Sequence, residues 1–161
     1  MSQAEIGTDL DASKYTPEQY EEFKKLFPEQ STNTLARFLI ARNGNIELAS
    51  TLLSEHLTWR KDNLPALKET CLIEFESGKA YIRGKDLLGH PILHFHTYLH
   101  DPYDRHIDEL IRMTLLVFET ALSKLENNLS KITVLLNRVG ASSGSDVEFA
   151  QKLTGILQNN Y

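Results

Sequence analysis

The sequence predicts an α/β fold in which a segment of three to four helices precedes a mixed or parallel sheet flanked by helices. Two observations support this prediction. Within residues 16–62 the apolar side chains recur at the spacing of amphipathic helices. From residue 79 onward, short strand-like segments alternate with two long helical patterns. Such alternation is typical of parallel strands joined by helical crossovers.

Three short helices are expected within residues 16–62. The first begins after Thr16, whose hydroxyl can cap the helix while Gln19 completes a capping box. Pro28 ends this helix, since proline cannot continue the helical hydrogen bonds. Two further helices follow, and a fourth, shorter helical stretch is expected over residues 67–75.

The strand pattern begins with residues 79–83 and 91–98, which are separated by a turn bounded by glycines. A long helix over residues 106–125 follows, with a wide apolar face. The apolar run Ile132–Leu136 then predicts a strand covered on both faces. Parallel pairing is expected between the strands on either side of this helix.

The last helix is expected to begin at Ser145, with Glu148 three residues on as its capping partner. Its apolar face is predicted to include Val147, Phe149 and Leu153. The order of elements after residue 78 is therefore strand, strand, helix, strand, helix.

Composition excludes several classes of function. The 161 residues carry 17 Lys and Arg against 22 Asp and Glu, so the net charge is −5, and 41% of the residues are hydrophobic. This balance argues against a disordered chain and against a nucleic-acid partner. No apolar run is long enough to span a membrane, and the N-terminus lacks the pattern of a secretory signal. With Cys71 as the single cysteine, a cytoplasmic location is expected.

A histidine cluster raises the alternative of a metal-dependent enzyme. His94 and His96 would share one face of a strand, and His100 or Asp101 could complete a divalent metal site. The competing interpretation is that the rings are hydrogen-bonded and face solvent or a covering helix. Because no cysteine pair or His-Glu helix motif accompanies the cluster, we predict neither a metal nor another cofactor.

The segment Gly140-Ala141-Ser142-Ser143-Gly144 fits the Gly-x-Ser-x-Gly pattern of a hydrolase nucleophile elbow. In that fold the catalytic acid and histidine follow the serine, whereas the last histidine here is His106. The segment is therefore predicted to be a small-residue loop, and the chain is not predicted to be an enzyme.

Five motifs occur in a characteristic order. The first is the segment Leu35-Ala36-Arg37-Phe38-Leu39-Ile40-Ala41-Arg42 followed by a helix ending in Trp59-Arg60. The others are Asp86-x-x-Gly89-His90-Pro91-Ile92, Glu119 in the long helix, Leu135-Leu136-Asn137-x-x-Gly140-x-Ser142, and Leu157-Gln158-Asn159-Asn160-Tyr161. In this order and spacing, the chain resembles the CRAL-TRIO (Sec14-like) family. It departs from that family in having His90 in place of an arginine and Asn137 in place of an aspartate.

The resemblance implies a non-catalytic module that binds, and in a complete chain transfers between membranes, a phospholipid such as phosphatidylinositol or another small hydrophobic molecule. The ligand would lie in an apolar pocket between sheet and helices. The positions that match pocket-lining positions of the family are Leu93, Phe95, Thr114, Phe118, Ser142 and Ser143. The alternative is a protein-interaction scaffold with an incomplete lipid-binding fold.

The resemblance also predicts the division of the chain. Residues 15–77 would be the helical segment that precedes the lipid-binding domain, and 78–161 the first half of that domain. Residues 1–14 are polar and carry no period, so a flexible leader is expected there. The chain is therefore expected to be a fragment. Transient peripheral contact with a membrane is expected of the complete protein.

Overall fold

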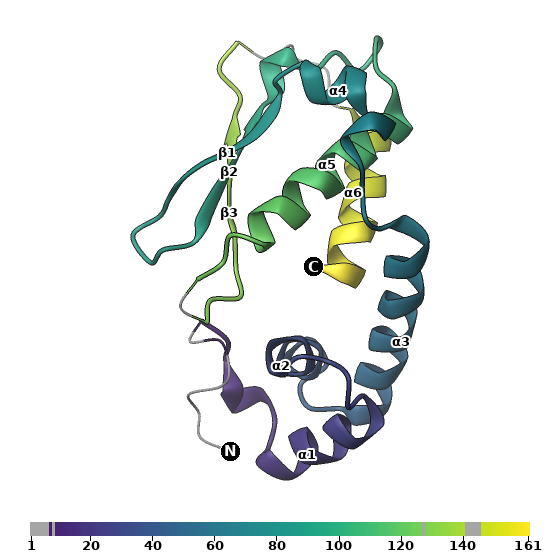
Figure 1. Ribbon diagram of the computed structural model, residues 1–161, viewed down its shortest axis with the longest axis vertical. Coiled ribbons are helices and arrows are strands. Elements are labelled where there is room, and N and C mark those ends of the chain that lie inside the picture. The colour runs from purple at the N-terminus through teal and green to yellow at the C-terminus, as the bar shows by residue number, and fades with distance from the viewer. Residues whose placement is uncertain (1–6, 8, 127, 141–145) are drawn as a thin grey trace. The chain divides into compact units, whose positions relative to one another are not determined.

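The computed structural model describes residues 7, 9–126, 128–140 and 146–161, which form two compact units (Figure 1). The first unit comprises the chain up to Asn63 together with residues 127–130, and the second comprises Leu64–Glu126 and Lys131–Tyr161. Within the described residues, no helix combines the length and hydropathy needed to cross a membrane.

The first unit is a small helical domain. It contains the short 3-10 helix η2 (Ala12–Lys14) and the helices α1 (Pro17–Leu26), α2 (Thr32–Ala41) and α3 (Ile46–Asn63). Its core includes Phe23, Leu35, Leu39 and Leu53, all fully buried. The predicted capping box is confirmed, since the Thr16 hydroxyl accepts the Gln19 N–H and the Gln19 side chain accepts the Thr16 N–H.

The second unit is built on a three-stranded sheet in the order β1-β2-β3. Strands β1 (Ala80–Lys85) and β2 (Pro91–His96) are antiparallel, whereas β3 (Thr133–Asn137) runs parallel to β2. The parallel pair is joined through helix α5 (Ile107–Leu122), so the predicted helical crossover is confirmed. The mixed sheet with flanking helices is the fold class expected from the sequence.

Four shorter or later elements complete this unit. They are η3 (Lys68–Thr70), α4 (Leu72–Glu76), η4 (Thr97–Leu99) and α6 (Val147–Asn160). The stretch predicted as one helix over residues 67–75 is thus two, because η3 ends at Thr70 and Cys71 separates it from α4.

Helix α5 packs on β1 and β2 and closes the core of the second unit. Leu93 of β2 and Met113 of α5 are fully buried in it, together with Cys71. From α6, Phe149 and Leu157 lie against the same core. The core of the second unit is therefore formed by side chains from the sheet, from α5 and from α6.

Two predictions about burial were wrong. Strand β3 is not covered on both faces: Val134, Leu135 and Leu136 are 43%, 44% and 61% exposed. The reason is that β3 lies at the edge of the described sheet, with α5 packed on the other two strands. Val147 of α6 was expected to face inward but is also exposed, whereas Phe149, two residues further along the helix, packs against the core.

The predicted cap of the last helix also needs correction. The N-cap is Asp146, whose carboxylate accepts the Phe149 N–H, so the helix begins one residue later than the sequence pattern indicated. Ser145 lies outside the described residues. A carboxylate can cap a helix as well as a hydroxyl does and also interacts favourably with the helix dipole.

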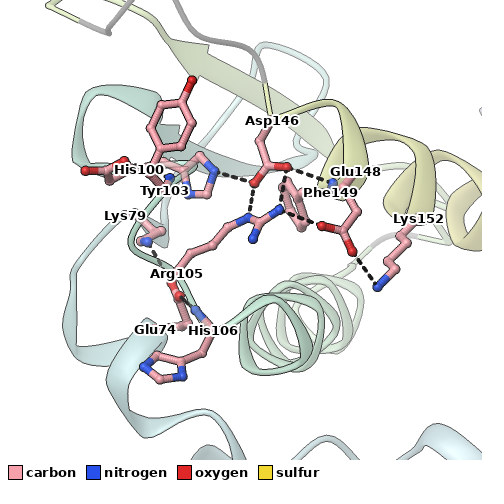
Figure 2. Close-up of polar contacts among 11 residues, drawn as sticks. Glu74, Lys79, His100, Tyr103, Arg105, His106, Asp146, Glu148, Phe149 and Lys152 are labelled. Carbon is pink, nitrogen blue, oxygen red and sulfur yellow. Dashed lines mark hydrogen bonds and ion pairs between the residues drawn. The ribbon is translucent and has the colours of Figure 1, made fainter.

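A buried ion pair joins α4 to the start of β1 and to α5. The Lys79 Nζ lies 2.6 Å from the Glu74 Oε2, and both side chains are almost completely buried (Figure 2). The other carboxylate oxygen, Oε1, accepts the backbone N–H of His106 at 2.9 Å. Glu74 therefore uses both oxygens to hold three segments of the second unit together.

We predict that Glu74→Leu lowers the free energy of unfolding by about 3–5 kcal/mol, because it leaves the Lys79 charge buried without its partner. The double variant Glu74→Leu/Lys79→Met should recover part of that loss. Urea denaturation followed by circular dichroism measures both. The matched control is Glu76→Leu, which changes an exposed glutamate on the same short helix and should alter stability little; equal losses in the two single variants would contradict this account.

Candidate lipid-binding site

Four of the predicted lipid-binding residues lie on β2 and α5. Leu93 and Phe95 alternate along β2 and face the helix, where they pack with Phe118 in the core. Thr114 of α5 is fully buried, and its hydroxyl donates to the Leu110 carbonyl at 2.8 Å. The hydroxyl predicted to orient a ligand is thus bonded within its own helix.

Ser142 and Ser143, the other two predicted residues, lie outside the described residues. So do the central residues of the Gly-x-Ser-x-Gly pattern. In the sequence, the two serines fall between β3 and α6.

The apolar face of the sheet continues beyond the part that α5 covers. The parallel register places Val134 beside Leu93 and Leu136 beside Phe95. Neighbouring residues of paired strands point to the same face, so the buried row on β2 extends into an exposed row on β3. We call Val134 and Leu136 the open apolar row. Sequence reasoning missed its exposure, because a continuous apolar run does not reveal which side remains uncovered.

The turn between β1 and β2 is organised by Asp86. Its Oδ1 accepts the N–H groups of Leu88 and His90, each at 2.9 Å. Its Oδ2 accepts the Thr133 hydroxyl at 2.7 Å and lies 2.9 Å from the His90 Nδ1. The Thr133 hydrogen bond above all, with those from His90 and Leu88, holds the pKa of Asp86 well below its usual range. This carboxylate therefore ties the turn to the first residue of β3.

His90 occupies the position where the CRAL-TRIO pattern has an arginine. The imidazole is buried against Asp86, so it keeps a hydrogen-bonding partner for the carboxylate at this point of the turn. At the other departure, the Asn137 amide Nδ2 lies 3.3 Å from His96 Nδ1, and its Oδ1 accepts the Val139 N–H. An aspartate could not donate the first of these contacts.

A second polar cluster joins the loops that follow β2 and β3 (Figure 2). Asp146, at the start of α6, accepts hydrogen bonds from Nε and Nη2 of Arg105 and lies 3.0 Å from the His100 Nε2. Arg105 also donates to Glu148, which pairs with Lys152 one helical turn further on. The Arg105 hydrogen bonds chiefly lower the pKa of Asp146 far below its usual range, and the same pairing raises the pKa of Arg105.

This cluster stands at the edge of the sheet where ligands of α/β proteins bind, outside the carboxyl ends of parallel strands. Arg105 and Asp146 are 41 residues apart in the sequence. No periodicity connects two such charges, so their contact could not be predicted from the sequence. Only the crossover through α5 brings them together.

His94 and His96 of the predicted cluster share one aromatic neighbour, whereas His100 contacts a different residue. The Tyr81 ring stacks on His94 and on His96, with centroid distances of 5.0 and 5.3 Å. His96 Nε2 also lies 2.9 Å from the Tyr81 hydroxyl, whereas His100 contacts Asp146. Among the described residues, no three His, Cys, Asp or Glu side chains are grouped as metal ligands would be.

With this geometry established, comparison with known proteins identifies the family. Residues 75–161 match the CRAL/TRIO domain. The chain belongs to the CRAL/TRIO domain family. This confirms the resemblance found in the sequence motifs. The chain is also 28% identical over 152 residues to the phosphatidylinositol transfer protein CSR1 of Eremothecium gossypii; the alignment covers 86% of this chain and 34% of that relative. This chain therefore spans about a third of the length of that relative.

We predict that acid weakens the second unit partly through Asp146. Because its pKa is lowered by folding, the stability it contributes is present above the unfolded-state pKa of about 3.9 and is lost as the pH falls below that value. Asp146→Asn keeps a capping oxygen but removes the charge. The variant should be less stable than the parent at neutral pH, and the difference should narrow toward about pH 3.

Urea denaturation across this pH range measures the effect. Asp104→Asn is the matched control, since Asp104 is an exposed carboxylate close to Arg105 in sequence and should show little difference from the parent at any pH. A difference between Asp146→Asn and the parent that stays constant with pH would contradict the prediction.

Proposed function

We propose that this chain is part of a protein that binds a phospholipid or another small hydrophobic molecule, and transfers it between membranes, without catalysing a reaction on it. The observation that carries the proposal is the match to the CRAL/TRIO domain over residues 75–161. Phosphatidylinositol is the first ligand to test, because the relative that aligns with most of this chain is a phosphatidylinositol transfer protein.

The open apolar row supports a location for the acyl chains. Val134 and Leu136 continue the face that carries Leu93 and Phe95, two of the residues proposed to bind lipid. A ligand lying along β3 would bury these exposed side chains, at a gain of about 25 cal/mol for each Å² of apolar surface. Leu93, Phe95 and Phe118 would then form the base of the site beneath the ligand.

The headgroup is proposed to lie beyond the carboxyl end of β3. Ser142 and Ser143 follow that strand and remain our candidates for hydrogen bonds to it. Thr114, also proposed from the resemblance, would contribute mainly by packing, because its hydroxyl is already bonded to Leu110. Binding and release of a lipid require burial of apolar surface and no covalent step, and we therefore propose a carrier rather than an enzyme.

The proposal is tested by two variants of neighbouring residues. Leu136→Asp places a charge in the open apolar row, while Leu135→Asp places the same charge on the opposite face of the same strand. We predict that Leu136→Asp weakens phosphatidylinositol binding at least about tenfold, whereas Leu135→Asp leaves it nearly unchanged. Native mass spectrometry of the 161-residue chain after incubation with phosphatidylinositol measures the bound fraction.

Circular dichroism of both variants shows whether the strand remains folded. If Leu135→Asp lost the lipid and Leu136→Asp kept it, the ligand would lie on the other face and the proposed location would be wrong. A parent chain that binds neither phosphatidylinositol nor phosphatidylcholine would contradict the lipid-binding function of this segment.

A further inference from the structure

Two adjacent leucines protrude from the turn between β1 and β2. Leu87 is fully exposed and Leu88 is 74% exposed. Isolated exposed leucines are common on protein surfaces, but contiguous apolar exposure calls for an explanation. In Figure 1 the teal turn joining β1 and β2 extends away from the rest of the sheet, so the leucines occupy the tip of a projecting hairpin.

The backbone of this tip is held in place from both sides. Asp86 N–H donates to the His90 carbonyl at 2.9 Å, and Gly89 N–H donates to the Asp86 carbonyl at 3.0 Å. The Asp86 carboxylate adds its bonds to Leu88, His90 and Thr133. Gly89 adopts a φ of 92°, which a residue with a side chain rarely accepts. The turn therefore holds the two leucines outward before any partner binds. Binding through them requires little further loss of backbone entropy.

Basic side chains flank the apolar tip. Arg83 and Lys85 lie on β1 immediately before the turn and are exposed, although the chain as a whole carries a net charge of −5. Lys85 reaches Glu126 Oε2 at 2.5 Å but remains 42% exposed. A β-bulge between Ile82 and Lys85, with Gly84 at a φ of 77°, alters the strand where these residues sit. Apolar residues beside lysine or arginine are the pattern of segments that lie at an anionic lipid surface.

We propose that the β1–β2 turn is a membrane-docking tip, in which Leu87 and Leu88 enter the headgroup region of an anionic bilayer while Arg83 and Lys85 contact its phosphates. The proposal rests on the proposed function in one respect: a lipid carrier must meet the membrane that supplies its ligand. Beyond that function, the proposal identifies the β1–β2 turn as the element that contacts the membrane. It also identifies the preferred membrane surface as anionic.

The small size of the tip favours a bilayer over a protein partner. A stable protein interface buries about 800 Å² on each partner, usually with complementary shape. Two leucines at a projecting turn offer far less area than that. A bilayer needs no complementary pocket, because it deforms around the inserted side chains, and the basic residues add long-range attraction.

The test measures binding of the 161-residue chain to sedimented vesicles. The vesicles contain phosphatidylcholine alone or phosphatidylcholine mixed with phosphatidylserine. Leu87→Asp should lower the partition coefficient on the mixed vesicles about tenfold. Leu48→Asp is the matched control, since Leu48 is 53% exposed in the first turn of α3, where an acidic residue is well accommodated. It should bind like the parent.

A second variant tests the charge contribution. Arg83→Glu should weaken binding to the mixed vesicles at least about fivefold and change binding to phosphatidylcholine vesicles little. A higher salt concentration should weaken binding of the parent to the mixed vesicles. It should also reduce the difference in binding between the parent and Arg83→Glu. Equal weakening on both kinds of vesicle would overturn the proposed role of Arg83.

The inference is overturned if Leu87→Asp, folded by circular dichroism, binds vesicles as well as Leu48→Asp does. It is also overturned if sedimentation without vesicles shows that the parent self-associates and Leu87→Asp does not, since the tip would then contact a second copy. Native mass spectrometry separates this proposal from the proposed function. A Leu87→Asp chain that keeps phosphatidylinositol but loses vesicle binding supports both, whereas leucine-dependent vesicle binding by a chain that takes up no lipid supports the tip alone.

Discussion

The packing of α5 across β2 is the constraint on which the second unit depends. Leu93 is fully buried beneath the helix, and β2 is the strand that pairs with both of its neighbours. Because the chain must pass through α5 before it returns as β3, the same helix sets the parallel pairing of β3. It also brings together the two loops at the carboxyl ends of β2 and β3, where Arg105 meets Asp146 (Figure 2). Removing this packing would thus disturb the sheet and the polar cluster together.

Three carboxylates carry the connections that hydrophobic packing alone does not make. Glu74 joins α4, β1 and α5; Asp86 joins the hairpin turn to β3; and Asp146 joins the start of α6 to the loop before α5. Each accepts bonds from groups distant in the chain, so each fixes a relation between elements. A buried ion pair adds little net stability compared with apolar packing but strongly penalises any arrangement that leaves one charge alone. These residues therefore restrict the unit to one arrangement of its loops.

The sequence predicted the elements more successfully than their surroundings. The capping box at Thr16 and Gln19, the strands around the glycine-bounded turn and the long amphipathic helix depend on local chemistry, which neighbouring residues reveal. The exposure of Leu136 depends on which elements lie over β3, and a run of apolar residues does not show which elements those are. The contact between Arg105 and Asp146 likewise depends on a crossover that no local pattern encodes. For the same reason, the motif that predicted Ser142 and Ser143 as lipid-binding residues could not place them, and their role stays a prediction, as does the division of the chain at residue 77.

The filled core between β2 and α5 limits where a lipid can lie. Leu93, Thr114 and Phe118 are already buried, so a ligand inserted between β2 and α5 would have to displace the helix that packs on the sheet. Protein interiors are close-packed, so such a displacement would cost the packing that holds α5 on the sheet. The open apolar row on β3 carries no such cost, because Val134 and Leu136 are exposed before a ligand arrives. These observations favour the proposed location along β3 over one inside the core.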